Sequence, residues 1–454
     1  MDIHTLVARQ REYFLKGATR SLAFRQLALQ KLQAAIKAQE SLLIHALTED
    51  LGKTPMETYM TETGLVLDEI RFHLKHLSRW MKEKTVATPL AQFYSHSFTS
   101  PEPYGVALIM TPWNYPLQLC LEPLVGAISA GNCAVVKPSA YAPATSAAIR
   151  QLIEGVFPPE YIAVVEGGRA ENSTLLQERF DYIFFTGSVS VGKTVMAAAA
   201  KHLTPVTLEL GGKSPVILDE TANLKIAARR IAFGKVLNAG QTCVAPDYLF
   251  LPKRLLEPFL REYQKALHGF FPDGSLRDMP FLVNEKHFNR VTGLMKPEKA
   301  AIGGGYNPDT RQIEPTVLVD VTPDAPIMQE EIFGPVLPIL TYEKLEECIS
   351  YIQSHEKPLA LYLFTESRRT QQQILSSCSF GGGCINDTVI HLATPHMGFG
   401  GVGASGMGSY HGYESFCTFS HFRSVVKKST RLDLPMRYHP YTPWKDRIIR
   451  MFLR

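Results

Sequence analysis

The fold is decided by the stretch GVALIM at residues 105–110, which is followed by a helical pattern at residues 116–128 and by a second apolar run, CAVVK, at residues 133–137. Both runs have the length and composition of a strand that is buried on its two faces. The same alternation continues with the apolar runs at 162–165 and 182–185 and with the helical segments at 144–155 and 191–201. Short buried strands that alternate with helices predict a parallel, doubly wound sheet, which binds its ligand at the carboxyl ends of the strands.

Helical patterns precede this alternation. Apolar residues recur at intervals of three, four and seven, as they do in an amphipathic helix. The recurring positions are Leu29, Leu32, Ile36, Leu43 and Leu47. Gly52 is expected to end this helical region as a C-cap, and a second helical stretch is predicted at residues 62–82. Both are expected to cover the sheet.

The residue pattern changes at residues 85–103, where Thr, Ser, Tyr and Phe alternate with polar residues and prolines lie at both ends of the segment. This pattern predicts a strand or hairpin that projects from the body of the molecule. A second region of alternating strands and helices begins after Gly211 and extends to about residue 418. The predicted fold class is therefore α/β, with two sheet-containing domains and a small β element.

Composition sets limits on the class of protein. At 454 residues the chain is long enough for two or three domains, and its 45% hydrophobic and 20% charged residues are ordinary for a globular protein. A net charge of +4 with nearly equal acids and bases argues against a dedicated nucleic-acid binder. Seven cysteines without a CxxC pair favour a reducing compartment over a disulfide framework, and argue against a structural zinc site.

The two ends of the chain bear on its location. The N-terminus has no charged region followed by an apolar core, and no apolar run reaches the length of a membrane span. We therefore expect a cytoplasmic protein with no membrane span. The tail RIIRMFLR at residues 447–454 is short, basic and apolar, which fits a packed C-terminus, a subunit contact or peripheral association with a membrane.

One motif favours a different class of enzyme. Residues 187–194, GSVSVGKT, match the phosphate-binding expression GxxxxGK[ST], and residues 216–220, VILDE, resemble the acid-ended strand that accompanies it. A nucleotide triphosphatase or kinase is thus one interpretation. The start of a helix after such a loop favours a phosphate on any nucleotide. This interpretation leaves Cys243, Asn114 and Glu331 without a role.

Cys243, in QTCVAP, and Glu209, in TLELGGKSP, offer a thiol and a carboxyl group among small residues. A thiol nucleophile and a carboxylate base are the parts needed to form and then hydrolyse a thioester. A free thiol titrates near ~8.5, so a reactive one usually has neighbours that assist its deprotonation. A buried, unreactive cysteine is the commoner case, and the pair alone does not decide the function.

Six short motifs occur in order along the chain. They are PWNYP at 112–116, KPS at 137–139, FTGS at 185–188, LELGG at 208–212, GQTC at 240–243 and EEIFGP at 330–335. In this order and spacing they resemble the aldehyde dehydrogenase superfamily, and the resemblance covers nearly the whole chain. The short N-terminal region and GMGSYHG at 406–412 resemble its class 3 branch, which includes fatty and aromatic aldehyde dehydrogenases.

The resemblance implies oxidation of aldehydes, either medium- or long-chain aliphatic or aromatic, to carboxylic acids with NAD or NADP. In this chemistry Cys243 attacks the aldehyde carbonyl to give a thiohemiacetal, which becomes a thioester. Asn114, with the backbone N–H of Cys243, forms the oxyanion hole. Glu209 is the general base for hydrolysis. Tyr115 and His391 are expected in an apolar substrate pocket, and no metal is implied.

The resemblance also implies a set of cofactor contacts. Lys137 is expected at the adenosine ribose, Ser188 at the pyrophosphate and Glu331 at the nicotinamide ribose. The remaining residues expected in the cofactor site are Trp113, Ser139, Gly187, Gly192, Leu210 and Phe333.

Two positions depart from the family pattern. Members devoted to NAD often carry an acid three residues after the equivalent of Lys137, where this chain has Ala140. Without that carboxylate the repulsion against a 2′-phosphate is absent, so dual use of NAD and NADP is expected. The second departure is MGF at residues 397–399, where related sequences often have Pro before Phe; it loosens the loop and affects nothing catalytic.

By resemblance, the NAD(P)-binding domain is Rossmann-like and comprises residues 1–84 and 104–209. The catalytic domain comprises residues 210–418, and residues 85–103 and 419–454 form an oligomerisation or bridging element. An exposed strand edge that a partner subunit satisfies agrees with a homodimer.

Two other members of the same fold remain as alternatives. A CoA-acylating enzyme passes the acyl group to a thiol instead of water, but such relatives lack the base at the Glu209 position. A non-catalytic structural or crystallin-type protein is expected to have lost Cys243 or Glu209, and both are present.

Overall fold

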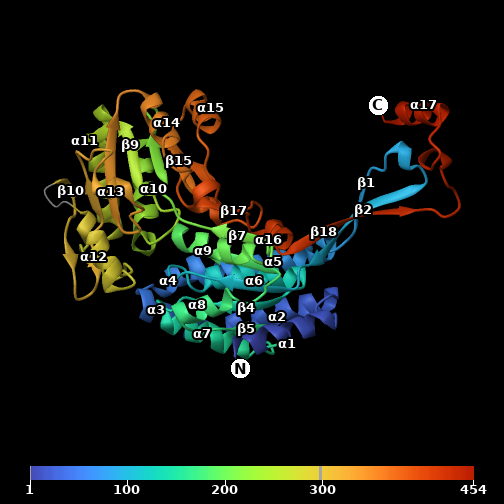
Figure 1. Cartoon of the computed structure of the whole chain (residues 1–454). Helices are drawn as coiled ribbons and strands as arrows, with labels where there is room; N and C mark the ends of the chain where they lie inside the picture. The colour runs from blue at the N-terminus through green and yellow to red at the C-terminus, as the bar shows by residue number, and fades with distance from the viewer. Residues whose placement is uncertain (1, 296–298, 454) are drawn as a thin grey trace.

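In a computed structural model, which describes residues 2–295 and 299–453, the alternating strands and helices form two separate sheets with an arm projecting beyond them (Figure 1). The α/β fold class predicted from the sequence is confirmed. Across the described residues, no helix has both the length and the apolar character that crossing a membrane requires.

The first sheet has six strands in the order β17-β7-β6-β3-β4-β5. Its strands are β3 (Val106–Met110), β4 (Cys133–Lys137), β5 (Ile162–Val164), β6 (Tyr182–Thr186), β7 (Val206–Glu209) and β17 (Gly406–Met407). All neighbours are parallel except β17, which is antiparallel to β7. Every residue of β3, β4 and β6 is buried, as the apolar runs predicted.

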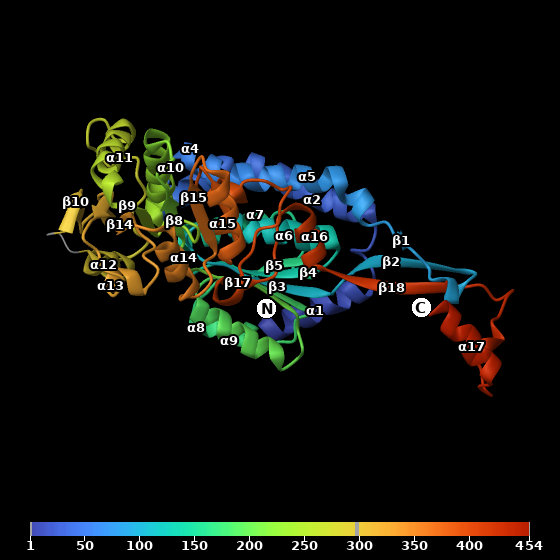
Figure 2. The same ribbon diagram turned by 90° about the horizontal axis from the view of Figure 1, so that it is seen from above.

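Helices cover both faces of this sheet. They are α1 (Ile3–Leu15), α2 (Leu22–Ala38), α3 (Glu40–Leu51), α4 (Pro55–Thr58), α5 (Gly64–Trp80), α6 (Gln118–Ala130), α7 (Pro143–Glu154), α8 (Arg169–Leu175), α9 (Val189–Ala200) and α16 (Gly412–Thr418). Figure 2 shows α6 and α7 on one face and α1, α8 and α9 on the other. The helix α6 packs on β3 and β4, while α2 and α5 pack over α6.

The second sheet has seven strands in the order β10-β13-β14-β9-β8-β15-β16, parallel except for the β10–β13 pair. Its strands are β8 (Pro215–Leu218), β9 (Tyr248–Pro252), β10 (Ala300–Ile302), β13 (Thr316–Leu318), β14 (Val336–Tyr342), β15 (Ala360–Phe364) and β16 (Gly382–Ile385). The other elements of this half are α10 (Leu224–Val236), α11 (Leu256–Phe270), α12 (Glu285–Leu294), α13 (Pro326–Gln329), α14 (Leu345–Gln353), α15 (Arg368–Ser377) and the hairpin β11 (Tyr306–Asn307) with β12 (Gln312–Ile313).

This arrangement contradicts the nucleotide triphosphatase interpretation. The GSVSVGKT loop joins β6 to α9 in the first sheet, whereas VILDE contains β8, which belongs to the second sheet. The phosphate loop and the acid-ended strand therefore do not lie on one sheet. Lys193, which would contact the phosphates in that interpretation, is exposed on α9.

The arm is a three-stranded antiparallel sheet in the order β1-β2-β18. It contains β1 (Lys84–Val86), β2 (Ser95–Pro103) and β18 (Ser420–Lys428), and the last helix, α17 (Pro443–Phe452), follows it. β18 pairs with β2 along nine residues, so two segments more than 300 residues apart in the chain form one structure. Figures 1 and 2 both show the arm and α17 extending beyond the two sheets.

A glycine ends helix α3, and a π-helical turn precedes helix α5. α3 ends at Gly52, which adopts a left-handed φ of 72°, so the predicted C-cap is confirmed. The helical stretch predicted at 62–82 is preceded by a π-helical turn, Tyr59–Thr63, which continues into α5. A Cβ at Gly64 would lie 2.4 Å from the Tyr59 carbonyl oxygen, so only glycine fits directly after this turn. Such π turns often occur at functional sites.

The π turn carries Glu62 into the interior, where it joins three segments of the chain. Its Oε1 accepts a 2.6 Å hydrogen bond from Lys53 Nζ, and both side chains are fully buried. Its Oε2 accepts the backbone N–H groups of Leu117 and Gln118 at 2.9 and 3.0 Å. Because α6 starts at Gln118 and has no side-chain cap of its own, the Glu62 carboxylate neutralises the positive end of that helix.

We expect Glu62→Gln to destabilise the protein strongly. The substitution removes the only carboxylate that is hydrogen-bonded to the buried Lys53 ammonium among the described residues, and breaking a buried ion pair typically costs about 3 kcal/mol or more. The exposed pair Lys16–Glu12 provides the matched control, since Glu12→Gln should change the free energy of unfolding by less than ~0.5 kcal/mol. Urea unfolding of the two variants measures the difference; equal midpoints would contradict a structural role for the buried pair.

Candidate active site

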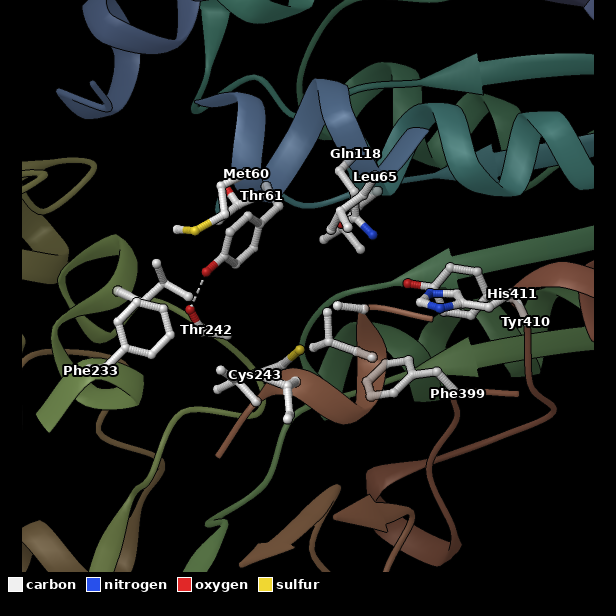
Figure 3. A pocket seen from close by; sticks show the side chains of 17 residues that line it. Met60, Thr61, Leu65, Gln118, Phe233, Thr242, Cys243, Phe399, Tyr410 and His411 are labelled. Carbon is white, nitrogen blue, oxygen red and sulfur yellow. Dashed lines mark hydrogen bonds between the residues drawn. The ribbon is translucent and has the colours of Figure 1, made fainter. Parts of the chain in front are cut away.

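Cys243 lies in the wall between two cavities. The first is apolar and is lined by residues that include Tyr115, Leu119 and Ile390. Figure 3 shows Met60, Leu65 and Phe233 in the same lining. The second contains Asn114, Glu209 and Glu331. The described residues that line both cavities are Leu119, Cys243, Phe399 and Tyr410. A molecule in either cavity can therefore contact the thiol, from an apolar side in the first cavity and from a more polar side in the second.

The loop that carries Cys243 has a strained backbone. After α10 the chain turns through Asn238 and Ala239, which have left-handed φ values of 50° and 52°. Non-glycine residues adopt this conformation at a cost that surrounding contacts must offset. Two such contacts are the Asn238 N–H bond to Glu57 Oε1 at 2.8 Å and the Gln241 Nε2 bond to the Phe281 carbonyl at 3.1 Å.

Asn114 lies between this loop and the Lys53–Glu62 pair. Its backbone carbonyl oxygen accepts hydrogen bonds from Asn238 Nδ2 at 2.7 Å and from Lys53 Nζ at 3.1 Å. Its own Nδ2 donates to the Gln241 carbonyl at 3.0 Å. A side-chain amide has two N–H donors, so the second remains for a group in the cavity that Asn114 lines.

Burial makes the resting thiol of Cys243 hard to ionise. Burial, together with the nearby carboxyl groups of Glu331 and Glu209, raises the pKa of Cys243 to about 12. The same environment raises the pKa of Glu331 to about 8, through burial and the charge of Asp247, against the opposing backbone N–H of Gly212. A base is therefore needed to take the thiol proton at neutral pH.

Glu209, at the end of β7, is buried and not solvated. Burial holds the pKa of its carboxyl group well above the usual range. Neither of its carboxyl oxygens has a hydrogen-bond partner among the described residues. Because an unsatisfied buried polar group is costly, these oxygens mark a place where a polar molecule in the cavity can be bound.

The apolar cavity holds one of the two residues predicted for the substrate pocket. Tyr115 lines it, and its hydroxyl group lies 2.6 Å from Thr242 Oγ1, beside Cys243. Ile390 and Leu392 also line it, but His391 between them is not among the described lining residues. The His391 Nδ1 instead lies 3.6 Å from Cys384 Sγ, behind the cavity wall. The prediction of His391 as a pocket residue is therefore not supported by its position.

A third cavity continues from the second one around the start of α9. Gly187 and Ser188 line the second cavity, while Ser190 and Val191 line the third, so the N-terminus of α9 lies between them. Ser188 makes no side-chain cap bond to the helix, which leaves backbone N–H groups available to a phosphate. A Cβ at Gly192 would lie 2.7 Å from the Leu210 side chain, so this helix turn packs closely against Leu210.

The third cavity contains the remaining residues that were predicted for the adenosine side. Lys137, Ser139 and Ala140 line it. The Lys137 ammonium donates 2.7 Å hydrogen bonds to the carbonyls of Pro138 and Gly167, and burial lowers the pKa of Lys137. A phosphate site between two cavities, one of which includes Cys243, is the arrangement that a dinucleotide requires.

The residues predicted for the other end of that dinucleotide lie in the second cavity. The Glu331 carboxylate lies against Gly211, where a Cβ would come within 2.2 Å of Oε2. The Phe333 ring packs edge-on against Trp113, with ring centroids 5.4 Å apart. Across residues 2–295 and 299–453, no group of three or more His, Cys, Asp or Glu side chains could hold a metal ion.

Comparison with known proteins agrees with this geometry. The family model described as the aldehyde dehydrogenase family matches residues 1–425. The chain belongs to the aldehyde dehydrogenase family. Members of this family oxidise aldehydes to carboxylic acids, and they use NAD or NADP.

Several relatives resemble the chain over almost its whole length. A Staphylococcus aureus 4,4'-diaponeurosporen-aldehyde dehydrogenase is 49% identical and covers 97% of both chains. A rat aldehyde dehydrogenase described as dimeric and NADP-preferring is 45% identical, covering 94% of this chain and 95% of its own, and mouse aldehyde dehydrogenase family 3 member B2 is 44% identical, covering 97% and 92%. The solved structure of the substrate-bound state of Staphylococcus aureus AldH is 48% identical, with a TM-score of 0.98 and full coverage of both chains.

The structure adds site residues to which the sequence analysis assigned no role. Phe399 and Tyr410 line both cavities, and His287 and Arg290 line the second. Phe399 and Tyr410 occur in stretches that resemble the family, so the sequence could have indicated them. Their pairing through an isolated β-bridge beside Cys243 cannot be seen in the neighbouring sequence of either residue. Met60 and Thr61 reach the apolar cavity through the π turn, which has no clear sequence signal.

We predict that alkylation of Cys243 is slow at neutral pH and rises about tenfold per pH unit between pH 7 and 9. The thiolate is the reactive form, and a pKa of about 12 leaves very little of it in this range. Glu331→Gln should accelerate the reaction at pH 8, because it removes a negative charge that raises the pKa of Cys243.

The measurement is mass spectrometry of the iodoacetamide-labelled Cys243 peptide over time. Glu330→Gln is the matched control, because Glu330 is exposed and does not contribute to the raised pKa of Cys243. A rate independent of pH between 7 and 9, or a slower reaction in Glu331→Gln, would contradict this account of the thiol.

Proposed function

We propose that the chain oxidises apolar aldehydes, medium- or long-chain aliphatic or aromatic, to free carboxylic acids, with NAD or NADP as the oxidant. The observation that carries the proposal is the place of Cys243 in the wall between an apolar cavity and a second cavity lined by three carboxyl groups, those of Glu209, Glu330 and Glu331. An aldehyde in the first cavity and a nicotinamide in the second would approach the same sulfur from different sides.

In the first step the Cys243 sulfur forms a bond to the aldehyde carbon while the thiol loses its proton. The carbonyl oxygen becomes an oxyanion, which the free N–H of the Asn114 amide and the backbone N–H of Cys243 stabilise. Glu209 and Glu331 are the carboxylates near enough to affect the thiol, and each can accept its proton only when ionised. The product is a thiohemiacetal on Cys243.

A bound NAD or NADP would accept a hydride from the former aldehyde carbon, which would leave that carbon as a thioester on the Cys243 sulfur. We propose that Lys137, Ser139 and Ala140 hold its adenosine end and Ser188, with the N-terminus of α9, its pyrophosphate. At the other end Glu331 binds the nicotinamide ribose. The remaining contacts in this proposal are Trp113, Gly187, Gly192, Leu210 and Phe333.

Hydrolysis then regenerates the thiol. Glu209 takes a proton from a water molecule as the water oxygen bonds to the thioester carbon, and the carbon–sulfur bond breaks. The carboxylic acid leaves and Cys243 recovers its proton. The unsatisfied oxygens of Glu209 support this role, because they can orient a water in the cavity that Cys243 shares.

The aldehyde is identified only by class. The apolar cavity supports substrates with a hydrocarbon body, because Met60, Leu65, Phe233 and Ile390 line it. The Staphylococcus aureus relative is named a 4,4'-diaponeurosporen-aldehyde dehydrogenase, so that aldehyde is one substrate to test.

We also propose that the protein is a cytoplasmic homodimer. Residues 1–84 and 104–209 would bind the cofactor, residues 210–418 would form the catalytic domain, and residues 85–103 and 419–454 would join two subunits. β18 lies at the edge of the arm sheet, and most of its residues are exposed, which supports pairing with a partner. Seven free cysteines agree with a reducing compartment.

Cys243→Ser should abolish aldehyde-dependent reduction of NAD and NADP, and Glu209→Gln should separate the two halves of the reaction. In Glu209→Gln we expect one equivalent of reduced cofactor in the first turnover and a steady-state kcat lower by about 10²- to 10⁴-fold, because Glu331 remains to take the thiol proton whereas hydrolysis depends on Glu209. Rapid-mixing absorbance at 340 nm with decanal and benzaldehyde measures both phases.

Two controls test the alternatives. Lys193→Ala should retain activity, since Lys193 is exposed and does not line the cavities described above. Added CoA should neither accelerate turnover nor appear as an acyl-CoA product. Activity that survives Cys243→Ser, or a wild-type kcat in Glu209→Gln, would refute the mechanism.

Cofactor preference gives a separate prediction. The wild-type protein should use NADP and NAD with comparable kcat/KM, and Ala140→Glu should lower kcat/KM for NADP by at least about tenfold, because it places a carboxylate in the cavity beside Lys137. Ala140→Gln, the uncharged match, should change it by less than about threefold. NADP use a thousandfold worse than NAD in the wild-type protein would contradict dual specificity.

A further inference from the structure

One side chain in the lining of the apolar cavity has a nitrogen atom without a hydrogen-bond partner. Other polar groups of this lining are satisfied: the Tyr115 hydroxyl group lies 2.6 Å from Thr242 Oγ1, and Thr61 Oγ1 donates to a backbone carbonyl at 2.7 Å. Among the described residues that line the cavity, His411 Nε2 is the one buried side-chain nitrogen or oxygen atom with no partner. An orphaned polar atom of this kind marks a place for a ligand group or a water molecule.

Packing holds the His411 ring in place. The residue is 5% exposed, and its ring stacks on Phe399 with ring centroids 5.7 Å apart and an angle of 29° between the planes. The next residue, Gly412, donates its backbone N–H to Glu69 Oε1 at 2.6 Å. In Figure 3 the ring extends from its backbone into the cavity, across from Phe233. The orphaned nitrogen is therefore preorganised, and a ligand that bonds to it pays little for ordering the side chain.

The protonation of the ring decides what this nitrogen can bind. Burial lowers the pKa of His411, against the charge of Glu69 and a hydrogen bond to the backbone of Leu392, which raise it. The ring is therefore neutral at pH 7, and a neutral imidazole has one N–H donor and one acceptor nitrogen. The bond to Leu392 raises the pKa because it is a donation from a ring N–H to a carbonyl. Since Nε2 has no partner, Nδ1 is that donor and Nε2 is a free acceptor.

Two further polar side chains lie beside His411 Nε2. Glu122 Oε2 is 3.3 Å from it but accepts a hydrogen bond from the amide of Gln118, and Gln118 lines the same cavity. Burial holds the pKa of Glu122 well above its usual range, which favours the neutral acid. We call His411, Gln118 and Glu122 the polar corner. Because its side chains are uncharged at pH 7, it suits a neutral group that donates a hydrogen bond to Nε2, and a hydroxyl group is the smallest of these.

We propose that the polar corner is a subsite for a hydroxyl group on the hydrocarbon body of the aldehyde. The inference rests on the proposed function, because it places the body of the aldehyde in the apolar cavity. A hydroxyl group that enters an apolar cavity loses its bonds to water, and an unpaired one is costly. The polar corner replaces those bonds through His411 Nε2. The cavity therefore accepts hydroxylated aldehydes that a purely apolar cavity would bind poorly.

The test compares kcat/KM for pairs of aldehydes in which a hydroxyl group replaces a methyl group. The pairs are 3- and 4-(hydroxymethyl)benzaldehyde against 3- and 4-ethylbenzaldehyde, and 8-hydroxyoctanal and 10-hydroxydecanal against nonanal and undecanal. They place the hydroxyl group at different distances from the aldehyde carbon. We expect at least one hydroxylated aldehyde to come within about tenfold of its methyl match in the wild-type protein. If all four are more than about tenfold worse, the proposal is overturned without any variant.

Variants of the polar corner test the same ratio of hydroxyl to methyl substrate. His411→Phe keeps a ring but removes the acceptor, so the ratio for the accepted pair should fall by at least about tenfold, and Gln118→Leu should lower it by at least about threefold. His411→Gln, which places an amide near Nε2, should restore it to within about threefold of the wild type. His391→Phe is the matched control and should leave the ratio unchanged, because that ring lies beside Cys384 and not in the cavity lining.

The ratio separates this subsite from a structural role of the same residues, since a general loss of activity lowers both members of a pair. An unchanged ratio in whichever of His411→Phe and Gln118→Leu still oxidises the methyl substrate would overturn the proposal, and the polar corner would then hold only water. Absence of turnover with every aldehyde in the wild-type protein would instead refute the proposed function, and the subsite with it.

Discussion

The backbone carbonyl of Asn114 is the contact on which the site depends. It receives one hydrogen bond from Lys53, which is buried with Glu62 under the first sheet, and one from Asn238, which belongs to the loop before Cys243. Glu62 in turn holds the first turn of α6. The oxygen therefore connects the helix that covers the first sheet with the loop that leads from α10 toward the second. The left-handed backbone at Asn238 is tolerated because these bonds exceed its strain.

Burial makes the thiol of Cys243 and the two carboxyl groups beside it weaker acids than they are in water. A thiol and two carboxyl groups in contact with water would titrate far from one another, but here burial raises the pKa of each of them. Their charges also oppose one another, so ionising one makes ionising the next harder. A site of this kind is unreactive at rest, and any ligand that brings polar groups into the cavity changes its protonation.

The sequence predicts the parts of the molecule that depend on local pattern. The buried strands β3, β4 and β6 and the end of α3 at Gly52 follow from apolar runs and from glycine chemistry. Ordered motifs also select Cys243, Glu209 and Asn114, which the structure brings around one cavity. What cannot be read locally is pairing across long distances and side-chain direction. The Lys53–Glu62 pair depends on a π turn, which the spacing of apolar residues in the sequence does not indicate. The side chain of His391 lies beside Cys384, whereas its neighbours Ile390 and Leu392 line the apolar cavity.

The two cavities also constrain the order of events under the proposed mechanism. The wall on the aldehyde side is apolar, so water there has few partners and a thiohemiacetal on Cys243 is protected from it. Glu209 lies on the other side, in the cavity proposed for the nicotinamide. Water that reaches Glu209 from this side would pass through the space that the nicotinamide fills during oxidation. Under the proposed mechanism, displacement of that ring would therefore separate the oxidation from the hydrolysis that follows it.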